Sequence, residues 1–442
     1  MRGLMRGNGS EKKKLWVLSL DALGSDDAAF FEQLPSFSFM KKNGVYVPHV
    51  RSVDPTLTYP AHTSIISGRP PASHGIVNNR KLQPEREKSD WFWFETDVRG
   101  DTLFRAAKRA GRTLATFLWP VGGKSGAEIN LAEIFPTQPL QNQALCSLRA
   151  GSFWSTLRFA RKFGRLRKGI SQPQLDNFTE ACAMDAIAHR DPDLLFVHFV
   201  DVDANKHFYG IHSPEAQAAI QRLDARVGRF LAHRAARPDA EQIDLVLLSD
   251  HSQMDAPHYL YPLDAFAERD WLEEENGTVP FYRAYPQSAG GSCFIYTASN
   301  FRSEEVPRLR TFLQQYAQKE EGIADLFFAP HSRFCESDPN AFAILEAKPG
   351  YCFSEFFQHR EAAKGEAAVH RANHGFSPDH PNYDAIFFAL GSSFLPGASL
   401  QERQSLLDIA PTLARVAHLP LQGAQGHVWT ALLKESLRTQ RV

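Results

Sequence analysis

Thr58 lies in a sequence setting that favours nucleophilic chemistry. It stands between Pro55 and Pro60 in the run PTLTYPAH, and the residues after it predict a helix that closes at Gly68. A hydroxyl at a helix N-terminus is well placed to meet an anion, because free N–H groups and the helix dipole point there. A threonine hydroxyl is a poor nucleophile at neutral pH, so it needs a base or a metal ion to activate it.

Carboxylate and imidazole side chains that could bind metal occur at other places in the chain. Asp203 and His207 are four residues apart, so on a helix or a tight turn they face the same way and can share one metal ion. Asp250 and His251 are adjacent, so the chain must turn there if both serve one cluster, although they could also bind different metals. His374 lies in a polar loop. With no clear Ser-His-Asp order in the sequence, these ligands make metal activation the favoured hypothesis for the threonine.

The elements that would position these side chains predict an open α/β sheet. Short unbroken apolar runs occupy residues 15–20, 194–200, 245–248 and 385–390. Such runs are typical of strands buried on both faces of a parallel sheet. Apolar residues at helical spacing follow Ser213-Pro214, a plausible helix start, and predict a helix between two of the strands.

Acidic or histidine residues follow the first three apolar runs directly. Asp21 follows the first run, Asp201 and Asp203 the second, and Asp250-His251 the third. One such residue is usually a helix cap or a turn residue. Three together are harder to explain that way, because sites in open α/β sheets form beyond the carboxyl ends of the strands. The sequence therefore predicts that three strands deliver metal-type ligands to one edge of the sheet.

The chain length predicts one large domain with an insertion, or two domains. The protein has 442 residues, of which 43% are hydrophobic and 22% charged, a composition typical of a globular protein. The stretch 253–370 is rich in aromatic and turn residues and breaks the strand–helix alternation. We therefore expect a catalytic core of residues 12–252 and 371–435, with residues 253–370 as an inserted subdomain that shapes the substrate pocket.

Charge and cysteine content restrict the possible partners and the cellular location. A net charge of −1 gives no global field to attract a nucleic-acid polymer. Five scattered cysteines without a CxxC pair predict reduced, mostly buried thiols. No apolar run is long enough for a signal peptide or a transmembrane helix, so we expect a cytoplasmic protein. The sequence leaves the oligomeric state open.

The stretch 149–168 is locally basic, unlike the chain as a whole. It carries seven cationic side chains: Arg149, Arg158, Arg161, Lys162, Arg165, Arg167 and Lys168. Such a run is commonly a solvated helix face, and the alternative is contact with an anionic surface or a peripheral phosphate.

The run PTLTYPAHTSIISGRPPASHGIVNN, which ends at Asn79, resembles the nucleotide pyrophosphatase/phosphodiesterase (type I phosphodiesterase) family of the alkaline phosphatase superfamily. That family carries a PT-x-T-aromatic-P-x-H segment, then P-x-x-HGI and Asn. The other ligand-type residues occur in the family order, and the tail DIAPTLARVAHLPLQGAQG resembles the closing helix. The resemblance spans about residues 15–430. It implies an α/β fold: an alkaline-phosphatase-like three-layer α/β/α sandwich with a largely parallel central sheet.

The resemblance also implies a two-metal mechanism. Thr58 would attack phosphorus to give a phosphothreonine, which water activated by a metal would hydrolyse, while the Thr58 N–H and the Asn79 amide hold a phosphoryl oxygen. Nitrogen and oxygen ligands suit two divalent ions, with Zn²⁺ expected and Mn²⁺ or iron as alternatives. The implied ligands are Asp203, His207 and His374 for one ion, and Asp21, Asp250, His251 and Thr58 for the other.

We expect the substrate to be a small-molecule phosphate ester, and a nucleotide is one candidate. An amide at Asn79, where monoesterases tend to place a cation, suits the lower charge of a diester. Tyr59 could stack on a base or another leaving group, and Trp91 and Trp93 could extend that wall, although ordinary core packing would also explain these aromatic residues.

Other functions are alternatives to this expected hydrolysis of phosphodiester or pyrophosphate bonds. A phosphomonoesterase, a phosphonate hydrolase or a phosphoryl transferase could use the same scaffold. A sulfatase is disfavoured because no C/S-x-P-x-R motif stands at the nucleophile. A metal-stabilised binding protein without turnover would lack a ligand or the nucleophile, and none is missing. The lack of a signal peptide, an anchor and a cysteine-rich region disfavours the extracellular nucleotide scavenging of secreted family members.

Overall fold

The structure is a computed structural model that describes residues 13–362 and 370–438. Residue 12, the predicted start of the core, and residues 363–369 of the predicted insertion lie outside the described residues. The centre of the fold is an eight-stranded sheet with the strand order β18-β2-β17-β6-β1-β5-β3-β4. Its strands are β1 (Lys14–Leu20), β2 (Val45–Arg51), β3 (Leu114–Phe117), β4 (Ile129–Leu131), β5 (Leu194–Phe199), β6 (Ile243–Leu248), β17 (Ala385–Leu390) and β18 (Gln404–Ser405).

Most of this sheet is parallel, as predicted. β1 pairs in parallel with both β5 and β6, and β3 pairs in parallel with β4 and β5. β17 is the exception, because it runs antiparallel to β2 and β6. The chain leaves the sheet at the carboxyl end of β6 and returns after the region 253–370 at the same edge, so the returning strand must run back along β6.

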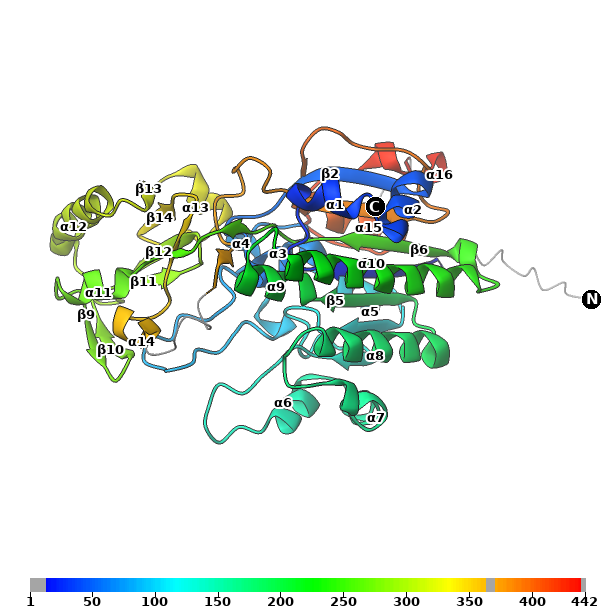
Figure 1. Cartoon of the computed structure of the whole chain (residues 1–442), viewed down its shortest axis with the longest axis horizontal. Coiled ribbons are helices and arrows are strands. Elements are labelled where there is room, and N and C mark those ends of the chain that lie inside the picture. The colour runs from blue at the N-terminus through cyan, green and yellow to red at the C-terminus, as the bar shows by residue number, and fades with distance from the viewer. Residues whose placement is uncertain (1–12, 363–369, 439–442) are drawn as a thin grey trace, which may run out of the picture.

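Helices cover both faces of the sheet and give the three-layer α/β/α sandwich (Figure 1). Alternate residues of β1 face opposite layers, since Leu15 and Val17 pack in one hydrophobic cluster and Trp16 and Leu18 in another. The first cluster includes α3 (Thr58–Ser67), α5 (Leu103–Arg109) and α15 (Ile409–Val416). The second includes α2 (Pro35–Asn43), α8 (Gln174–Arg190) and α10 (Pro214–Ala235). The helix predicted after Ser213 is α10, and the Ser213 hydroxyl accepts a hydrogen bond from the Ala216 N–H at its start.

Further helices connect or flank these layers. They are α1 (Ala28–Phe31), α4 (Pro71–His74), α6 (Gln143–Ala150), α7 (Phe153–Phe163), α9 (Asp201–Tyr209) and α16 (Glu435–Arg438). Among the described helices, none is long and apolar enough to cross a bilayer. None of the five cysteines, all of them among the described residues, forms a disulfide, and three of them are buried.

The region 253–370 builds a second sheet with its own hydrophobic core. Four antiparallel strands take the order β11 (Ala284–Ser288), β12 (Ser292–Thr297), β14 (Ala343–Ala347) and β13 (Ile323–Phe328), and α12 (Val306–Lys319) packs with them around Trp271 and Leu313. The division of the chain into core and insertion stays a prediction. The remaining elements are β7 (Met254–Asp255), β8 (His258–Leu260), β9 (Leu272–Glu275), β10 (Thr278–Tyr282), β15 (Tyr351–Phe353), β16 (Ala372–Asn373), α11 (Pro262–Ala267), α13 (Ser332–Glu336) and α14 (Gln358–Ala362).

Candidate active site

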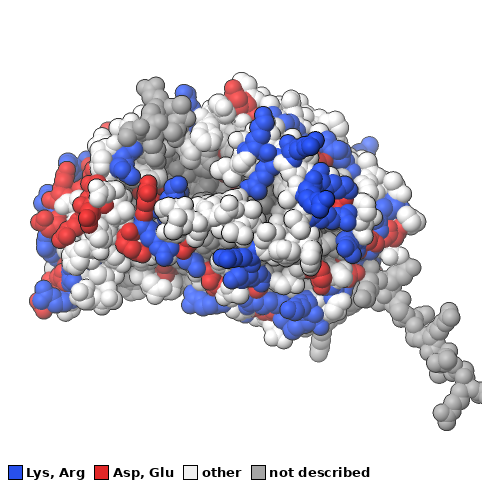
Figure 2. Space-filling view, turned by 90° about the horizontal axis from the view of Figure 1, so that it is seen from below, with Lys and Arg blue, Asp and Glu red and all other residues white. Residues whose placement is uncertain are grey.

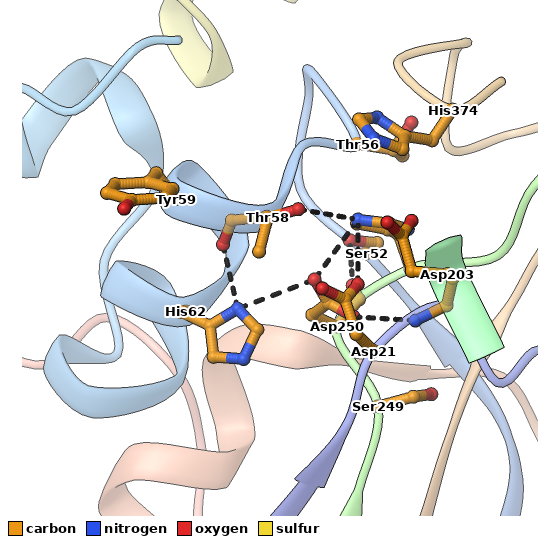
Figure 3. Close-up of polar contacts among 12 residues, drawn as sticks. Asp21, Ser52, Thr56, Thr58, Tyr59, His62, Asp203, Ser249, Asp250 and His374 are labelled. Atoms are coloured by element: carbon orange, nitrogen blue, oxygen red, sulfur yellow. Dashed lines mark hydrogen bonds and ion pairs between the residues drawn. The ribbon is translucent and has the colours of Figure 1, made fainter. Parts of the chain in front are cut away.

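Thr58 is the first residue of α3, and its side chain faces the carboxyl edge of the sheet (Figure 3). The helix ends where Gly68 takes the left-handed conformation with φ of 66°, as the sequence predicted. Two hydrogen bonds fix the loop before the helix, because the Thr56 hydroxyl donates to the Phe376 carbonyl and the Gly375 N–H donates to the Thr56 carbonyl. These contacts hold the nucleophile candidate beside the loop that carries His374.

The first group of ligand-type side chains surrounds the Thr58 hydroxyl. Asp21 follows β1, and Asp250 and His251 follow β6; their potential ligand atoms lie within 4.8 Å of one another. His251 Nε2 lies 3.1 Å from Asp250 Oδ2, 3.5 Å from Asp21 Oδ1 and 3.2 Å from Thr58 Oγ1. The chain turns after β6 so that both Asp250 and His251 reach one cluster.

The second group combines α9 with the late loop. Asp203 and His207 lie one turn apart on α9, and His374 comes from the loop after β16; their potential ligand atoms also lie within 4.8 Å of one another. The His207 Nε2–Asp203 Oδ1 distance is 3.4 Å. The His251 and His374 rings are 4.4 Å apart between centroids, so the two groups are neighbours.

Two of the histidines are held in the tautomer that a metal needs. His207 Nδ1 lies 2.8 Å from the Ala372 carbonyl, and His251 Nδ1 lies 3.1 Å from the Ser252 carbonyl. A carbonyl only accepts hydrogen bonds, so each Nδ1 carries the proton and each Nε2 keeps a lone pair. The lone pairs are on the sides that face the two groups, which is the arrangement found for metal-binding histidines.

Buried polar atoms that make no hydrogen bond show that the chemistry of both groups fits a divalent cation. Asp21 Oδ1, Asp250 Oδ2 and His374 Nδ1 are buried and make no hydrogen bond to any described residue. Burial, and then the neighbouring Asp250 carboxylate, raise the pKa of Asp21 well above its ordinary value. Burial, and then His251 and His207, hold the pKa of His374 well below its ordinary value. Isolated buried charges are costly unless a partner compensates them. Oxygen and nitrogen donors of this kind fit divalent cations such as zinc, which would supply that partner.

A third acidic group differs from these two. Asp26, Asp27 and His212 also bring potential ligand atoms within 4.8 Å of one another. Asp27, however, forms an ion pair of 2.6 Å with the buried Lys206. Its charge is already neutralised inside the protein, so the fit to a cation is poorer there.

Three buried side chains, His198, His62 and Ser19, lie next to the ligand-type residues. The sequence analysis did not single them out. His198 Nε2 lies 3.0 Å from Asp21 Oδ2. His62 Nδ1 lies 2.8 Å from the Thr58 carbonyl and 3.4 Å from Asp250 Oδ2, while its Nε2 lies 2.8 Å from Ser19 Oγ. The available signal was a pair of polar residues inside apolar strands, since Ser19 of β1 lies opposite His198 of β5.

Asp203 has a support of its own. The Gln253 amide donates to Asp203 Oδ1 over 2.5 Å, and Gln253 is 1% exposed.

Asn79 lies beside the start of α3. The Tyr59 N–H donates to Asn79 Oδ1 over 2.9 Å, which turns the two amide donors of Asn79 toward other partners. The structure thus places an amide next to the nucleophile candidate, and the role of this amide stays a prediction.

Tyr59 and Trp93 are placed differently from the expectation that they form an aromatic wall. Tyr59 is fully buried, and Figure 3 shows its ring pointing away from the ligand-type residues. It packs with Ile76 and Trp93, which is 5% exposed. The aromatic residue beside the nucleophile candidate is part of the core, because burying its ring gains more than leaving a large apolar face in water.

Trp91 does line the pocket beside the site. A cavity of about 350 Å³ is bounded by Asn79, Trp91, His207 and His374, and the region 253–370 contributes Tyr259 and Phe356 to its wall. Arg80 stacks on Trp91 at 5.6 Å and pairs with Glu355 over 2.5 Å. The pocket therefore joins the ligand-type residues to one aromatic wall.

The sequence of the chain matches one known protein family. A family model described as type I phosphodiesterase/nucleotide pyrophosphatase matches residues 15–333. The chain belongs to this family. The resemblance found in the sequence is thereby confirmed.

Relatives in the type I phosphodiesterase family are distant. Human ectonucleotide pyrophosphatase/phosphodiesterase family member 1 is 27% identical over 239 residues, which cover 52% of this chain and 22% of that protein. An uncharacterized pyrophosphatase/phosphodiesterase of Schizosaccharomyces pombe is 24% identical over 433 residues, which cover 93% of this chain and 78% of that protein. The chain thus spans about a fifth of the length of the human relative.

Solved structures confirm the fold of the family. Murine ectonucleotide pyrophosphatase/phosphodiesterase 5, solved as an inactive form in complex with AMP, matches with a TM-score of 0.67 and 18% identity. The match covers 96% of this chain and 100% of that chain. The architecture is therefore alkaline-phosphatase-like over nearly the whole length.

Proposed function

We propose that this protein is a metal-dependent hydrolase of phosphodiester or pyrophosphate bonds that works through a phosphothreonine on Thr58. One observation carries the proposal. The Thr58 hydroxyl lies at the N-terminus of α3, 3.2 Å from His251 Nε2, with two neighbouring groups of carboxylates and imidazoles beside it. A hydroxyl among so many metal-type ligands has the means of activation that threonine lacks on its own.

The two groups would each hold one divalent cation, with zinc expected first. Asp21, Asp250, His251 and Thr58 would hold one, and Asp203, His207 and His374 the other. Such a pair of cations would lower the pKa of a coordinated hydroxyl and stabilise the charge that develops on the attacking and leaving oxygens.

The residues of the chain would then bind and orient the phosphate. The Thr58 N–H at the start of α3, with the helix dipole, would attract a phosphoryl oxygen. The Asn79 amide, oriented by its bond to the Tyr59 N–H, donates to a phosphoryl oxygen as well. Thr58 Oγ1 forms a bond to phosphorus as the leaving group departs, and water later cleaves the phosphothreonine.

The pocket supports a leaving group with a flat apolar part. Trp91 presents a half-buried ring beside Asn79, in a cavity of about 350 Å³. Such a ring can stack on a nucleobase. The murine relative was solved with AMP, and we infer that nucleotides are among the substrates. The cytoplasmic location expected from the sequence stays a prediction.

Relative turnover of aryl phosphates tests the proposal. We expect bis(4-nitrophenyl) phosphate to be hydrolysed at least about tenfold faster than 4-nitrophenyl phosphate, because an amide stands where a monoesterase would offer a cation. A chelator should abolish turnover, and zinc or manganese should restore it. A preference for the monoester would favour a phosphomonoesterase on the same scaffold. Full activity of the metal-free protein would contradict the role of metals.

A further inference from the structure

We propose that the surface formed by α6, α7 and the residues that flank them docks on an anionic lipid bilayer. This surface, residues 140–170, is called the α6–α7 face. It surrounds the basic stretch singled out in the sequence, which the proposed hydrolysis does not use. Figure 1 shows α6 and α7 at the bottom of the molecule, away from the region 253–370.

The charged side chains of the α6–α7 face and its immediate flanks are all positive. Residues 134–175 contain seven Lys and Arg and no Asp or Glu, although the whole chain has a net charge of −1. Figure 2, viewed from the side of α6 and α7, shows Lys and Arg side chains gathered among uncharged surface. A concentrated positive surface attracts anionic lipid headgroups within a Debye length of the membrane.

Several of these cations have no acidic partner in the part of the chain that the structure describes. Arg158 and Lys162 both pair with Asp185 on α8. Arg149, Arg161 and Arg165 are exposed, and the ion pairs of the described residues include none of the three. Their charge is therefore available to an external anion.

Large apolar side chains are exposed on the same face. Seven of the twelve exposed large hydrophobic residues of the described chain lie in this segment of 31 residues, so they form a concentrated patch. The most exposed are Leu140 at 100%, Trp154 at 77% and Ile170 at 73%. The others are Leu145, Phe153, Leu157 and Leu166. Concentrated exposed apolar surface on a soluble fold marks an interaction site.

The arrangement on α7 matches a helix that lies in a membrane interface. Its inner side buries Thr156 and Phe159, and the Phe159 ring packs 5.7 Å from Phe117 of β3. Its outer side presents Phe153 and Trp154 in the first turn, and cationic residues in the second half. Trp and Phe beside Arg and Lys is the composition of interfacial helices, which insert the rings while the cations contact headgroups.

Two other occupants fit these observations less well. A nucleic acid would use the cations, but it would leave Leu140, Leu145 and Ile170 without apolar contacts. A second copy docked by a twofold axis would bring the same cationic surface against itself, which is repulsive. A bilayer with anionic lipids satisfies both the charge and the apolar side chains.

Vesicle flotation of the full chain tests the proposal. We expect binding to phosphatidylcholine vesicles that contain phosphatidylglycerol, and at least about tenfold weaker binding to phosphatidylcholine alone, because both forces are needed. The double variants Trp154→Ser/Ile170→Ser and Arg161→Glu/Arg165→Glu should each weaken binding at least about tenfold by removing one of the forces. Higher salt should weaken the binding of the wild-type protein.

Matched surface variants outside the face serve as controls. Phe281→Ser removes an exposed apolar ring, 47% exposed, from β10, and Lys42→Glu reverses an exposed charge on α2. Both should bind as the wild type does, and all variants should show wild-type circular dichroism. The proposal is overturned if wild-type protein does not bind the anionic vesicles or if the face variants bind as the controls do. Loss of DNA binding or of a dimer in the face variants, without vesicle binding, would assign the face to that partner instead.

Discussion

At the scale of single residues, His198 and His62 contact the ligand-type carboxylates Asp21 and Asp250. His198 lies 3.0 Å from Asp21 Oδ2, and His62 bridges the Thr58 carbonyl, Asp250 and Ser19. Both histidines are completely buried. Side chains in such positions orient the groups that bind a metal and tune their basicity.

Replacing His198 with glutamine should therefore weaken metal binding. We expect zinc affinity to fall by about 10- to 100-fold, because Asp21 loses the contact that orients its carboxylate. Competition with a chromophoric chelator measures the affinity. His189→Gln removes a half-exposed histidine on α8 that contacts Asp185 and no ligand-type residue, and it should leave the affinity unchanged. Equal affinities of the two variants would show that His198 has no orienting role.

The ligand-type residues themselves were predictable, because each follows an apolar strand or belongs to a recognisable motif. The structure brings together Asp203, His207 and His374, and separately Asp21, Asp250 and His251. The positions of Tyr59 and Trp93 were not predictable in this way, since an aromatic residue beside a nucleophile looks the same in sequence whether its ring faces the pocket or the core. His198 was missed because one histidine in a buried strand has no spacing signature of its own.

At the scale of elements, α3 carries the nucleophile candidate and depends on how it ends. Gly68 closes the helix with φ of 66°, and a Cβ added there would lie 2.8 Å from Ala424 Cβ. Any other residue would therefore meet both backbone strain and a steric clash.

Gly68→Ala should destabilise the protein more than a matched glycine change. We expect about 1 kcal/mol from the left-handed conformation alone, and a further loss from the contact with Ala424. Gly169→Ala is the control, because Gly169 has φ of 58° but open space around a built Cβ. Urea denaturation compares the two, and equal midpoints would show that the contact with Ala424 costs nothing.

The strands of the central sheet were largely predictable, because doubly buried strands form continuous apolar runs. The directions of the strands were less predictable than their positions. The run at 385–390 has the composition of the parallel strands, yet β17 is antiparallel. Composition reports burial, whereas direction depends on where the chain re-enters the sheet after the region 253–370.

At the scale of the whole molecule, the site joins segments that are far apart in the sequence. Asp21, Asp203, Asp250 and His374 come from β1, α9, the end of β6 and the return from the region 253–370. An unfolded chain would not hold these groups together. Metal binding should therefore stabilise the folded state specifically.

Metal removal should lower the melting temperature of the protein. At a metal concentration a hundredfold above the dissociation constant, binding adds about 2.7 kcal/mol to the free energy of unfolding, so we expect chelation to lower the melting midpoint by several degrees. His207→Gln removes one ligand-type side chain and should shrink the difference. Identical melting of the metal-loaded and chelated wild-type protein would argue against resident metals.

Turnover of a Thr58→Ala variant tests the central claim most directly. Hydrolysis of an aryl phosphodiester is measured for the wild type, Thr58→Ala and Thr58→Ser, with the metal content of each determined in parallel. We expect Thr58→Ala to keep its fold and bound metals but to lose at least about 1,000-fold in kcat, while Thr58→Ser, which keeps a hydroxyl, retains measurable activity. Near-wild-type turnover by a folded, metal-loaded Thr58→Ala protein would contradict the assignment of Thr58 as the nucleophile.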